Sequence, residues 1–428
     1  MLPANHPLRL SLANEVHARP PELLVAPLRL SYLAVYSDWD HRAAQWAHVC
    51  ALVHRYDVKA PEPHANHFSA DLGPFRVKWE LHAEFARYTF IAHGVDGDLF
   101  ANPALDLLPA DWVASIPGEL LVAAHVVMVP GTTLPADYDE IAHEHFAGNA
   151  MVGAGVAGGA GAAFTDFRIH ADGFSRFLVA DADMTPRQAG RTVQRLLEIE
   201  TYRMLALLAL PMARELAPVL LQHETELSGI TQTLSTASDT EEQPLLQRLT
   251  SLEAAIESRQ STNSYRFSAA AAYHELVQQR TDELREQRIQ GLQTFREFME
   301  RRLAPAMNTC STTATRQESL SLRVSRVSQL LSTRVDLTHE RQNQSLLASM
   351  DRRAKLQLRL QETVEGLSIA AITYYIISLV GYVAKALKAF DLHLNPELVM
   401  GLSIPVVVAL LLAGARRTRR LMQGGHDE

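Results

Sequence analysis

The chain contains little cysteine and none of the paired spacing that cysteine-based sites need. Cys50 and Cys310 are the 2 cysteines among 428 residues, and no CxxC motif occurs. A disulfide framework is therefore excluded, and a reducing compartment is favoured. The N-terminal stretch MLPANHPLRLSLANEVHARPP also lacks the apolar core of a secretory signal peptide. We therefore expect the bulk of the protein to be made and kept in the cytoplasm.

Positive charge is in deficit as well. The 40 Lys and Arg residues against 48 Asp and Glu residues give a formal net charge of -8 at pH 7. A general nucleic-acid binder needs clustered cations, so we expect no nucleic-acid partner. A mean hydropathy of -0.05 excludes a protein that lies mostly in a membrane. No residue spacing predicts a bound cofactor, and we expect none.

Two uncharged apolar runs, residues 367–384 and 398–415, stand out from this polar background. Each is about 18 residues long, or about 27 Å as a helix, which is just enough to span a bilayer core. Buried core helices are the alternative, but core helices of this length normally keep one polar face. We therefore expect two transmembrane helices within residues 367–415, joined by a short loop, with the lipid bilayer as a partner.

Basic residues flank the two runs on what would be one side of the membrane. Four precede the first run and four follow the second: Arg352, Arg353, Lys355 and Arg359, then Arg416, Arg417, Arg419 and Arg420. Lys and Arg accumulate on the cytoplasmic side of membrane helices. We therefore expect a bacterial inner-membrane protein with a periplasmic loop, a basic cytoplasmic tail at residues 416–428, and both termini in the cytoplasm.

Two patterns within the runs predict helix contacts. Gly401 and Ala409 belong to a series of small residues, four apart, that lets helices approach closely, so we expect self-association. Polar residues fall on one side of the first run: Ser368, Tyr375, Ser378 and Tyr382. Such a stripe either forms hydrogen bonds between packed helices or lines a pore. Lys385 would lie at its outer end.

Residues 186–366 are polar, rich in Gln, Glu and Arg, and poor in glycine and proline, which predicts a stalk of long helices. Apolar spacing of three and four residues indicates coiled-coil-like seams along Leu246, Leu249, Glu253 and Ile256, and along Leu320, Val324, Val327 and Leu331. Pro305 marks a break or a kink. We expect the last stalk helix to continue directly into the first transmembrane helix.

Residues 1–185 have a different composition, with frequent Pro, Gly, His and aromatic residues. Strands are expected at 28–36, 75–82, 86–93 and 119–129, with a hairpin at 164–181 that turns at Ala171-Asp172-Gly173. Helices are expected at 38–56, 135–146 and 185–210. This pattern predicts a cytoplasmic α+β head with a mostly antiparallel sheet.

Three motifs in the head have both a functional and a structural interpretation. GAGVAG at residues 153–158 matches GxGxxG, but a β-type run follows it where a dinucleotide site needs a helix, so a bulged strand entry is favoured. Asp137, Glu140 and Glu144 share one helix face, where they would hold a divalent cation weakly or complement the helix dipole. In an extended chain the side chains of Glu15, His17 and Arg19 share one face, and Asn14 lies next to them. Together these residues would bind an anion or form a local salt-bridged cluster.

Longer stretches of the chain carry a resemblance. ANEVHARP, TDFRIHADGFSRFLV, LREQRIQGLQTFREFMERRLAPAMNTC and RRAKLQLRLQETVEGLSIAAITYY resemble the domain-of-unknown-function 3422 family, a bacterial family of uncharacterised membrane-anchored proteins, over nearly the whole chain. The resemblance implies membrane association and no particular activity.

The predicted layout is also similar to the CorA family of magnesium channels, which combine a cytoplasmic α+β domain, long stalk helices, two C-terminal spans and a basic end. That family carries Gly-Met-Asn at the outer end of the first span, where this chain reads GYVAKAL, residues 381–387. The tripeptide occurs nowhere in the sequence, and Lys385 places a cation where a cation filter needs oxygen ligands.

No catalytic arrangement can be supported from residue spacing. We therefore expect a non-enzymatic, homo-oligomeric scaffold or regulatory protein of the inner membrane. A CorA-like ion channel or transporter that lacks the filter is the second hypothesis, and an enzyme housed in the head is the third.

Overall fold

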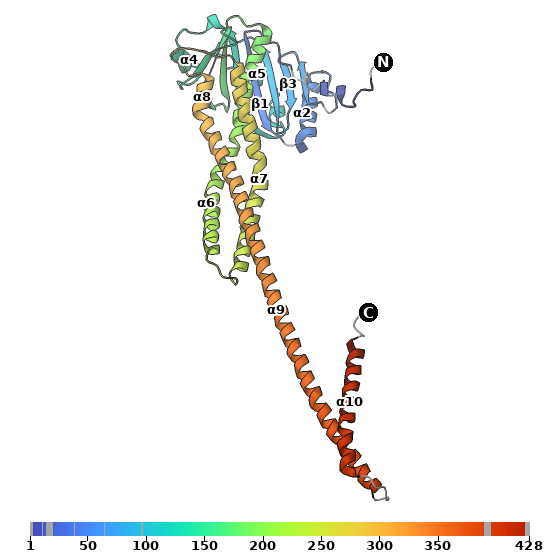
Figure 1. The fold of residues 1–428 in the computed structure, drawn as a ribbon. Coiled ribbons are helices and arrows are strands. Elements are labelled where there is room, and N and C mark those ends of the chain that lie inside the picture. Colours follow the sequence, from blue (N-terminus) through green and yellow to red (C-terminus); the bar gives the residue numbers. More distant parts are fainter. Residues whose placement is uncertain are drawn as a thin grey trace. The chain divides into compact units, whose positions relative to one another are not determined.

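The computed structural model describes residues 3–10, 12–13, 20–37, 39–63, 65–95, 97–388 and 395–423. The chain forms two compact units (Figure 1). The first consists of residues 1–237 and 244–328, and the second of residues 238–243 and 329–428. The expected division into head, stalk, spans and tail stays a prediction.

Within the described residues, the first unit is built on one nine-stranded sheet with the order β2-β3-β4-β1-β5-β8-β7-β6-β9. The strands are β1 (Leu28–Tyr36), β2 (His67–Asp71), β3 (Arg76–Leu81), β4 (Phe85–His93), β5 (Glu119–Pro130), β6 (Val152–Val156), β7 (Gly161–Thr165), β8 (Ser175–Asp181) and β9 (Gln287–Arg288). Neighbouring strands pair antiparallel except β5 and β8, which are parallel. The α+β class and the four expected single strands are confirmed, and β7 and β8 form the expected hairpin.

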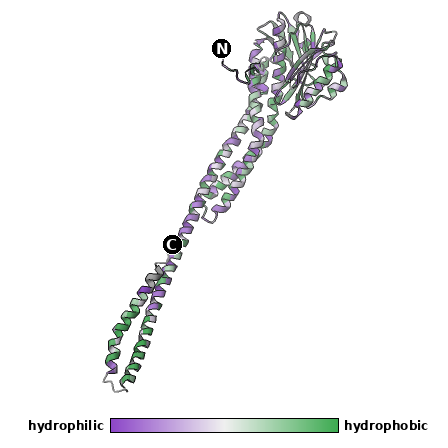
Figure 2. Ribbon diagram, turned by 90° about the vertical axis from the view of Figure 1, so that its right-hand side faces the viewer, coloured by the Kyte–Doolittle hydropathy of each residue, from purple (hydrophilic) through white to green (hydrophobic). Residues whose placement is uncertain are grey.

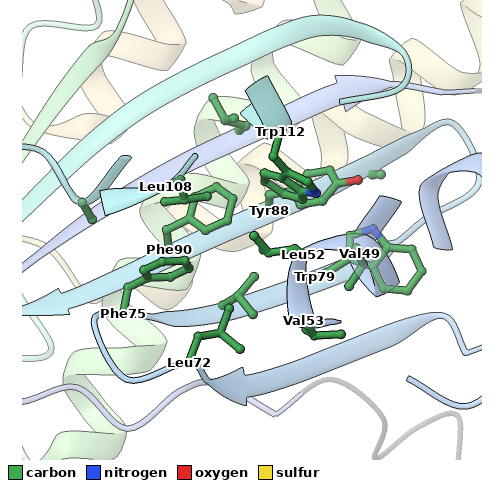
Figure 3. Close-up of a cluster of buried hydrophobic side chains, with 14 of the residues drawn as sticks. Val49, Leu52, Val53, Leu72, Phe75, Trp79, Tyr88, Phe90, Leu108 and Trp112 are labelled. Atoms are coloured by element: carbon green, nitrogen blue, oxygen red, sulfur yellow. The ribbon is translucent and has the colours of Figure 1, made fainter. Parts of the chain in front are cut away.

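Alternation along the strands sends side chains to two different layers. One face is covered by α2 (Arg42–Arg55), α3 (Ala110–Ala114) and α4 (Tyr138–His145). Figure 3 shows the core on this side, where α2 and α3 meet the strands; its fully buried members include Val49, Leu52, Trp79, Tyr88, Phe90 and Trp112. The dense aromatic packing makes this face of the sheet a closed core.

The opposite face is covered by α5 (Pro186–Leu207), which begins at a capping box formed by Thr185 and Gln188. A helix that starts with a cap and with Pro186 in its first turn has a defined starting point. Most residues of α5 from Ala189 onward are buried, including charged Glu198 and Glu200. This face therefore differs from the aromatic face because it encloses charge.

Further helices complete the first unit: α6 (Ala209–Leu234), α7 (Glu242–Glu283), α8 (Phe295–Arg302) and the start of α9 (Ala304–Lys388). In both ribbon views α6, α7 and α9 run side by side (Figures 1 and 2), and Arg316 of α9 pairs with Glu224 of α6 at 2.8 Å. The break before Pro305 is confirmed, because α8 ends at Arg302 and α9 begins at Ala304.

Each predicted seam matches the buried residues only in part. In α9, Leu320, Val324 and Leu331 are buried, whereas Val327 is half-buried. In α7 the buried residues are Leu245, Leu249, Leu252 and Ile256, whereas the expected Leu246 and Glu253 are half-buried. The shift follows from where the neighbouring helices lie, since a seam faces whichever helices pack against it.

The second unit contains the last part of α9 and the helix α10 (Pro396–Gln423). Figure 2 shows that α10 and the final part of α9 beside it are coloured mostly hydrophobic. The two helices contact each other at Gly381, because a Cβ atom there would lie 2.6 Å from Sδ of Met400. A glycine at this position therefore permits the close approach of α9 and α10.

Candidate functional site

An extended N-terminal segment, residues 20–24, lies over the face of the sheet that α5 covers. Glu22 anchors it, since its Oε1 accepts a hydrogen bond from Ser69 Oγ and its Oε2 from Arg76 Nε, both at 2.7 Å. Gly190 of α5 makes room for it, because a Cβ atom there would lie 1.7 Å from the Glu22 carbonyl oxygen. The predicted motif Asn14, Glu15, His17 and Arg19 comes just before this segment and lies outside the described residues.

Next to this segment, charged side chains of alternating sign form a continuous chain, which we call the ion chain. Its members come from β3, β4, α5 and α7: Lys78, Glu80, Arg87, Glu198, Arg280, Glu283 and Arg195. The central residues are almost completely buried, with side-chain exposures of 2% for Glu80, 5% for Arg87 and 7% for Glu198. The ion chain therefore connects the sheet to the C-terminal end of α7 through the interior of the first unit.

The distances show how each charge is shared. Arg87 donates to Glu80 through Nε and to Glu198 through Nη1 at 3.2 Å. Glu198 also accepts hydrogen bonds from Gln194 at 2.7 Å and from Arg280 Nε. Buried charges are tolerated when they are paired and hydrogen-bonded. Glu198 satisfies both conditions.

The pKa shifts follow from this burial and pairing. Burial alone would raise the pKa of Glu80, but attraction and hydrogen bonding to Arg87 outweigh it and hold the pKa below its ordinary value. Burial lowers the pKa of Lys78, and attraction to Glu80 restores it only in part. Glu80 and Arg87 are therefore charged at neutral pH, and the proton of Lys78 is held less firmly than that of an exposed lysine.

A small cavity of about 40 Å³ adjoins the ion chain and is lined in part by Tyr32, Lys78, Glu80 and Thr89. Lys78 Nζ donates to the Pro20 carbonyl at 2.7 Å and lies 3.4 Å from Glu80 Oε1. That contact is electrostatic only, because Glu80 Oε1 has no hydrogen-bond partner among the described residues. The cavity has room for about three water molecules, which is too small for an organic substrate.

The ion chain arises from strand register, and the sequence contained its signal. In β3 the buried Val77 and Trp79 alternate with Lys78 and Glu80, which therefore point to the other face. Glu80 is directly opposite Arg87 across the β3–β4 pair, where opposite charges stabilise a sheet. Sequence reasoning missed the site because register between strands is not visible in either strand alone.

A second buried polar pair joins Ser31 of β1 to His125 of β5. Ser31 Oγ accepts a hydrogen bond from the Leu105 backbone N–H at 3.0 Å and lies 3.0 Å from His125 Nδ1. Because a hydroxyl has one donor and two acceptor sites, Ser31 Oγ can pair with His125 Nδ1 in either direction, and the tautomer of the ring sets which atom donates. Burial lowers the pKa of His125 to about 4. Phe174 stacks on the ring at 3.9 Å and Ser31 has no exposed surface, so the pair is a structural link and not an accessible nucleophile with its base.

The three acidic residues near α4 have a different arrangement. Asp137 is the N-cap of the helix, and its carboxylate accepts a hydrogen bond from the Asp139 N–H at 2.9 Å. Glu140 is exposed, and Glu144 lies 3.7 Å from His145 Nε2. The described residues contain no group of three His, Cys, Asp or Glu side chains arranged to hold a metal ion. Asp137 thus acts at the helix end, as the dipole interpretation describes.

The glycine motif GAGVAG begins in β6 and ends in the turn that leads to β7. The helix that would direct its N-terminus at a pyrophosphate is replaced by a strand. Gly155 and Gly159 make room for Gln287 of β9, since a Cβ atom would lie 3.2 Å and 2.7 Å from its side chain. These glycines border a groove of about 660 Å³. Its two charged lining residues already have partners, because Asp181 accepts a hydrogen bond from the Met184 N–H and Arg288 forms an ion pair with Glu297.

The predicted membrane residues are exposed, except Ser378, which is half-buried. Tyr375 and Tyr382 are 69% and 71% exposed. Ser368 and Ser378 donate to the carbonyl oxygens of Val364 and Tyr374, one turn earlier in the same helix. Lys385, Gly401 and Ala409 are exposed, and a Cβ atom at Gly401 would meet nothing within 4 Å. The polar stripe of α9 and the small-residue series of α10 can therefore face lipid or a second copy of the chain. Their roles stay predictions.

Comparison with known proteins gives a family for the chain but no activity. No curated protein matches the chain. One family model matches residues 4–422, which include both compact units, and its description assigns no activity. The chain therefore belongs to the family described as Protein of unknown function (DUF3422).

Proposed function

We propose that this protein is a non-enzymatic, oligomeric scaffold or regulatory protein of the bacterial inner membrane, anchored by the last part of α9 and by α10. Three described helices are long and apolar enough to cross a membrane: Pro186–Leu234, Ala304–Leu387 and Pro396–Arg417. The observation that carries the proposal is the exposure of the last two, whose apolar windows are 11% and 0% buried. Exposed apolar surface costs about 25 cal/mol per Å² in water, so these helices need lipid around them.

The remaining candidate, Pro186–Leu234, corresponds to α5 and α6 and is 33% buried over its apolar window. Its first half holds Glu198 in the ion chain, against the sheet. A helix that pairs buried charges with neighbouring elements belongs to a soluble core, and we place it in the cytoplasmic head.

Two antiparallel spans would return the chain to the side from which it came. Gly381 lets the two helices approach closely at Met400, and Arg416 and Arg417 follow the second span. Basic residues on that side favour the cytoplasm, so we expect both termini there. A single helix of 85 residues, α9, belongs to both compact units and would link the anchor to the head.

The ion-channel hypothesis is kept because the tyrosine stripe is exposed and available to a shared axis. Against it, the hydroxyls of Ser368 and Ser378 are already bonded within their own helix. Lys385 would also repel cations at the mouth of such a pore. The enzyme hypothesis has less support, because the cavity beside the ion chain is small and the Ser31–His125 pair is closed.

Flux measurements separate the scaffold from the channel. We expect purified wild-type protein in liposomes to pass no magnesium, potassium or chloride above the background of empty liposomes. Lys385→Asn removes the cation at the expected mouth and serves as the matched variant. Selective flux in the wild type, or cation flux that appears only in Lys385→Asn, would replace the scaffold with the channel.

A further inference from the structure

A polar pocket of about 190 Å³ lies where α5, the turn between β6 and β7, and the end of α7 meet. Its lining residues are Ala157, Gln188, Arg191, Thr192, Arg195, Glu283 and Arg285. Three guanidinium groups against one carboxylate give the pocket a formal charge of +2, within a chain whose net charge is -8. The pocket is therefore a local site of positive charge on an acidic protein, which favours a negatively charged ligand.

The sequence places four of the lining residues on one face of α5. Gln188, Arg191, Thr192 and Arg195 follow one another at steps of three, one and three residues, so they share a side of the helix. Like charges four residues apart, as at Arg191 and Arg195, destabilise a helix. A bound anion would relieve that repulsion.

Two of the three arginines have no ion-pair partner in the described part of the chain. Arg195 pairs with Glu283 at 2.9 Å, whereas neither Arg191 nor Arg285 makes an ion pair. A free guanidinium group offers several N–H donors in a planar fork, and this geometry suits the oxygens of a phosphate group. Arg191 and Arg285 are therefore available to a ligand without breaking an existing contact.

The backbone around the pocket is held in a conformation that side chains rarely adopt. Ala157 and Arg285, both lining residues, have φ angles of 54° and 51°. Such left-handed residues other than glycine are uncommon and persist where the surroundings enforce them. The Ala157 N–H donates to the Leu284 carbonyl at 2.9 Å and so fixes the turn beside Arg285.

A simpler explanation covers only part of this arrangement. A cation just beyond the C-terminal end of a helix complements the helix dipole, which accounts for Arg285 after α7. It does not account for Arg191, an exposed residue of the second turn of α5. Arg191 lines the pocket together with Arg195 and Arg285, and the combined positive charge of the three favours an anion there.

We propose that the pocket formed by Arg191, Arg195 and Arg285 binds a small phosphate group, either free or on a short phosphomonoester. Its volume is below the range of about 300–1,000 Å³ that is typical of sites for larger organic ligands. The lining contains neither an aromatic side chain to stack on a base nor a long aliphatic one to hold an acyl chain. These features favour a compact ligand over a nucleotide or a lipid tail.

The pocket also shares two residues with the ion chain. Arg195 and Glu283 line it, and Glu283 continues to Arg280 and from there to Glu198. A phosphate group that binds Arg195 competes with Glu283 for the same guanidinium. Occupancy of the pocket would thereby change the charge balance at the end of α7. This inference is independent of the scaffold proposal, since it concerns ligand binding and not flux or anchoring.

Isothermal titration of the full-length protein in detergent with inorganic phosphate tests the proposal, with chloride at matched ionic strength as the blank. The variants are Arg191→Gln and Arg285→Gln, each of which removes one unpaired cation. Arg187→Gln is the control, because Arg187 is exposed one turn away and does not line the pocket. We expect each pocket variant to bind phosphate about tenfold more weakly than wild type, the usual effect of one lost charge-assisted hydrogen bond. The control should stay within about twofold.

A second comparison distinguishes a soluble phosphate from a lipid headgroup. Glycerol 3-phosphate and dihexanoyl phosphatidic acid carry the same phosphomonoester with and without acyl chains. We expect the soluble compound to bind at least as well, whereas tighter binding of the lipid would assign the pocket to a headgroup. The proposal is overturned if wild type binds phosphate no better than chloride, or if Arg187→Gln weakens binding as much as the pocket variants do.

Discussion

The segment Pro186–Leu234, which comprises α5 and α6, and helix α10 meet the same criterion of length and apolar composition for a membrane span, yet they have opposite surroundings. Residues of α5 lie against a sheet, where Glu198 is held by Arg87 and Arg280. The apolar window of α10 has no buried residue, and side chains such as Leu402 and Leu410 are more than two-thirds exposed. Hydropathy alone therefore does not separate a core helix from a membrane helix. The interaction partners of the polar residues in each segment distinguish the two kinds of helix.

The largest expected effect comes from removing the exposed apolar helices. We expect a chain that ends at Gln361 to leave the membrane fraction completely while its head stays folded, because the remaining long apolar helix packs within the first unit. Fractionation and circular dichroism measure the two properties. If the truncated protein still sediments with membranes after a salt wash, then α5 and α6 or another part of the head contacts lipid, and the comparison between the two kinds of helix fails.

Breaking the ion chain should be the next largest effect. Glu198→Gln removes the carboxylate that Arg87 and Arg280 share, and we expect a loss of about 3–5 kcal/mol in the free energy of unfolding, the usual cost of an unpaired buried charge. Glu226→Gln is the matched control, since Glu226 and Arg248 form an exposed pair 3.9 Å apart. The control should cost less than about 1 kcal/mol. Chemical denaturation measures both, and equal losses would mean that the ion chain contributes no more than a surface pair.

A smaller effect is expected where α5 meets the N-terminal segment. Gly190→Ala would place a Cβ atom 1.7 Å from the Glu22 carbonyl oxygen, so we expect about 1–3 kcal/mol of destabilisation. Gly229→Ala, on an open face of α6, is the control, because a Cβ atom there meets nothing within 4 Å. It should stabilise the protein by up to about 1 kcal/mol, as replacing a helical glycine usually does. Thermal unfolding of the pair decides the sign, and stabilisation by both would show that the segment moves away easily.

At neutral pH the smallest effect comes from His125, whose contribution to stability changes only as the pH falls. Its folded pKa of about 4 lies below the ordinary value of 6.5, so the unfolded state binds more protons between these two values. Stability from this group is therefore fully present above about pH 6.5 and decreases as the pH falls towards 4, by at most about 1.4 kcal/mol per unit. Asp172 favours protonation of the ring and Arg176 opposes it. His125→Gln should flatten this part of the stability curve, and an unchanged curve would assign the slope to other groups.

The sequence predicted properties that depend on one segment of the chain better than those that depend on contacts between segments. Strands 28–36 and 119–129 were predicted because β-type residues mark them, and a helix was expected from residue 185, where the structure begins α5 after the capping residue Thr185. In α7 the predicted Leu249 and Ile256 are buried, whereas the other two buried positions lie one residue earlier than predicted, since burial there depends on the helices beside it. The spacing of Gln188, Arg191 and Arg195 was visible in the sequence, but nothing local indicated that Arg285 would lie opposite them.

The sequence by itself determined the class of the protein: an α+β region, a long helical region and apolar segments that can cross a membrane, because composition and periodicity act within a single element. It also determined the family, through stretches that extend over both units. Only the tertiary structure decided which buried charges meet. Glu80 faces Arg87 because of strand register, and Arg87 meets Glu198 because α5 covers that side of the sheet. The exposed Arg191 and Arg285 line one pocket because α7 ends beside the β6–β7 turn. Contacts between residues far apart in the chain depend on the packing of whole elements, which no single segment encodes.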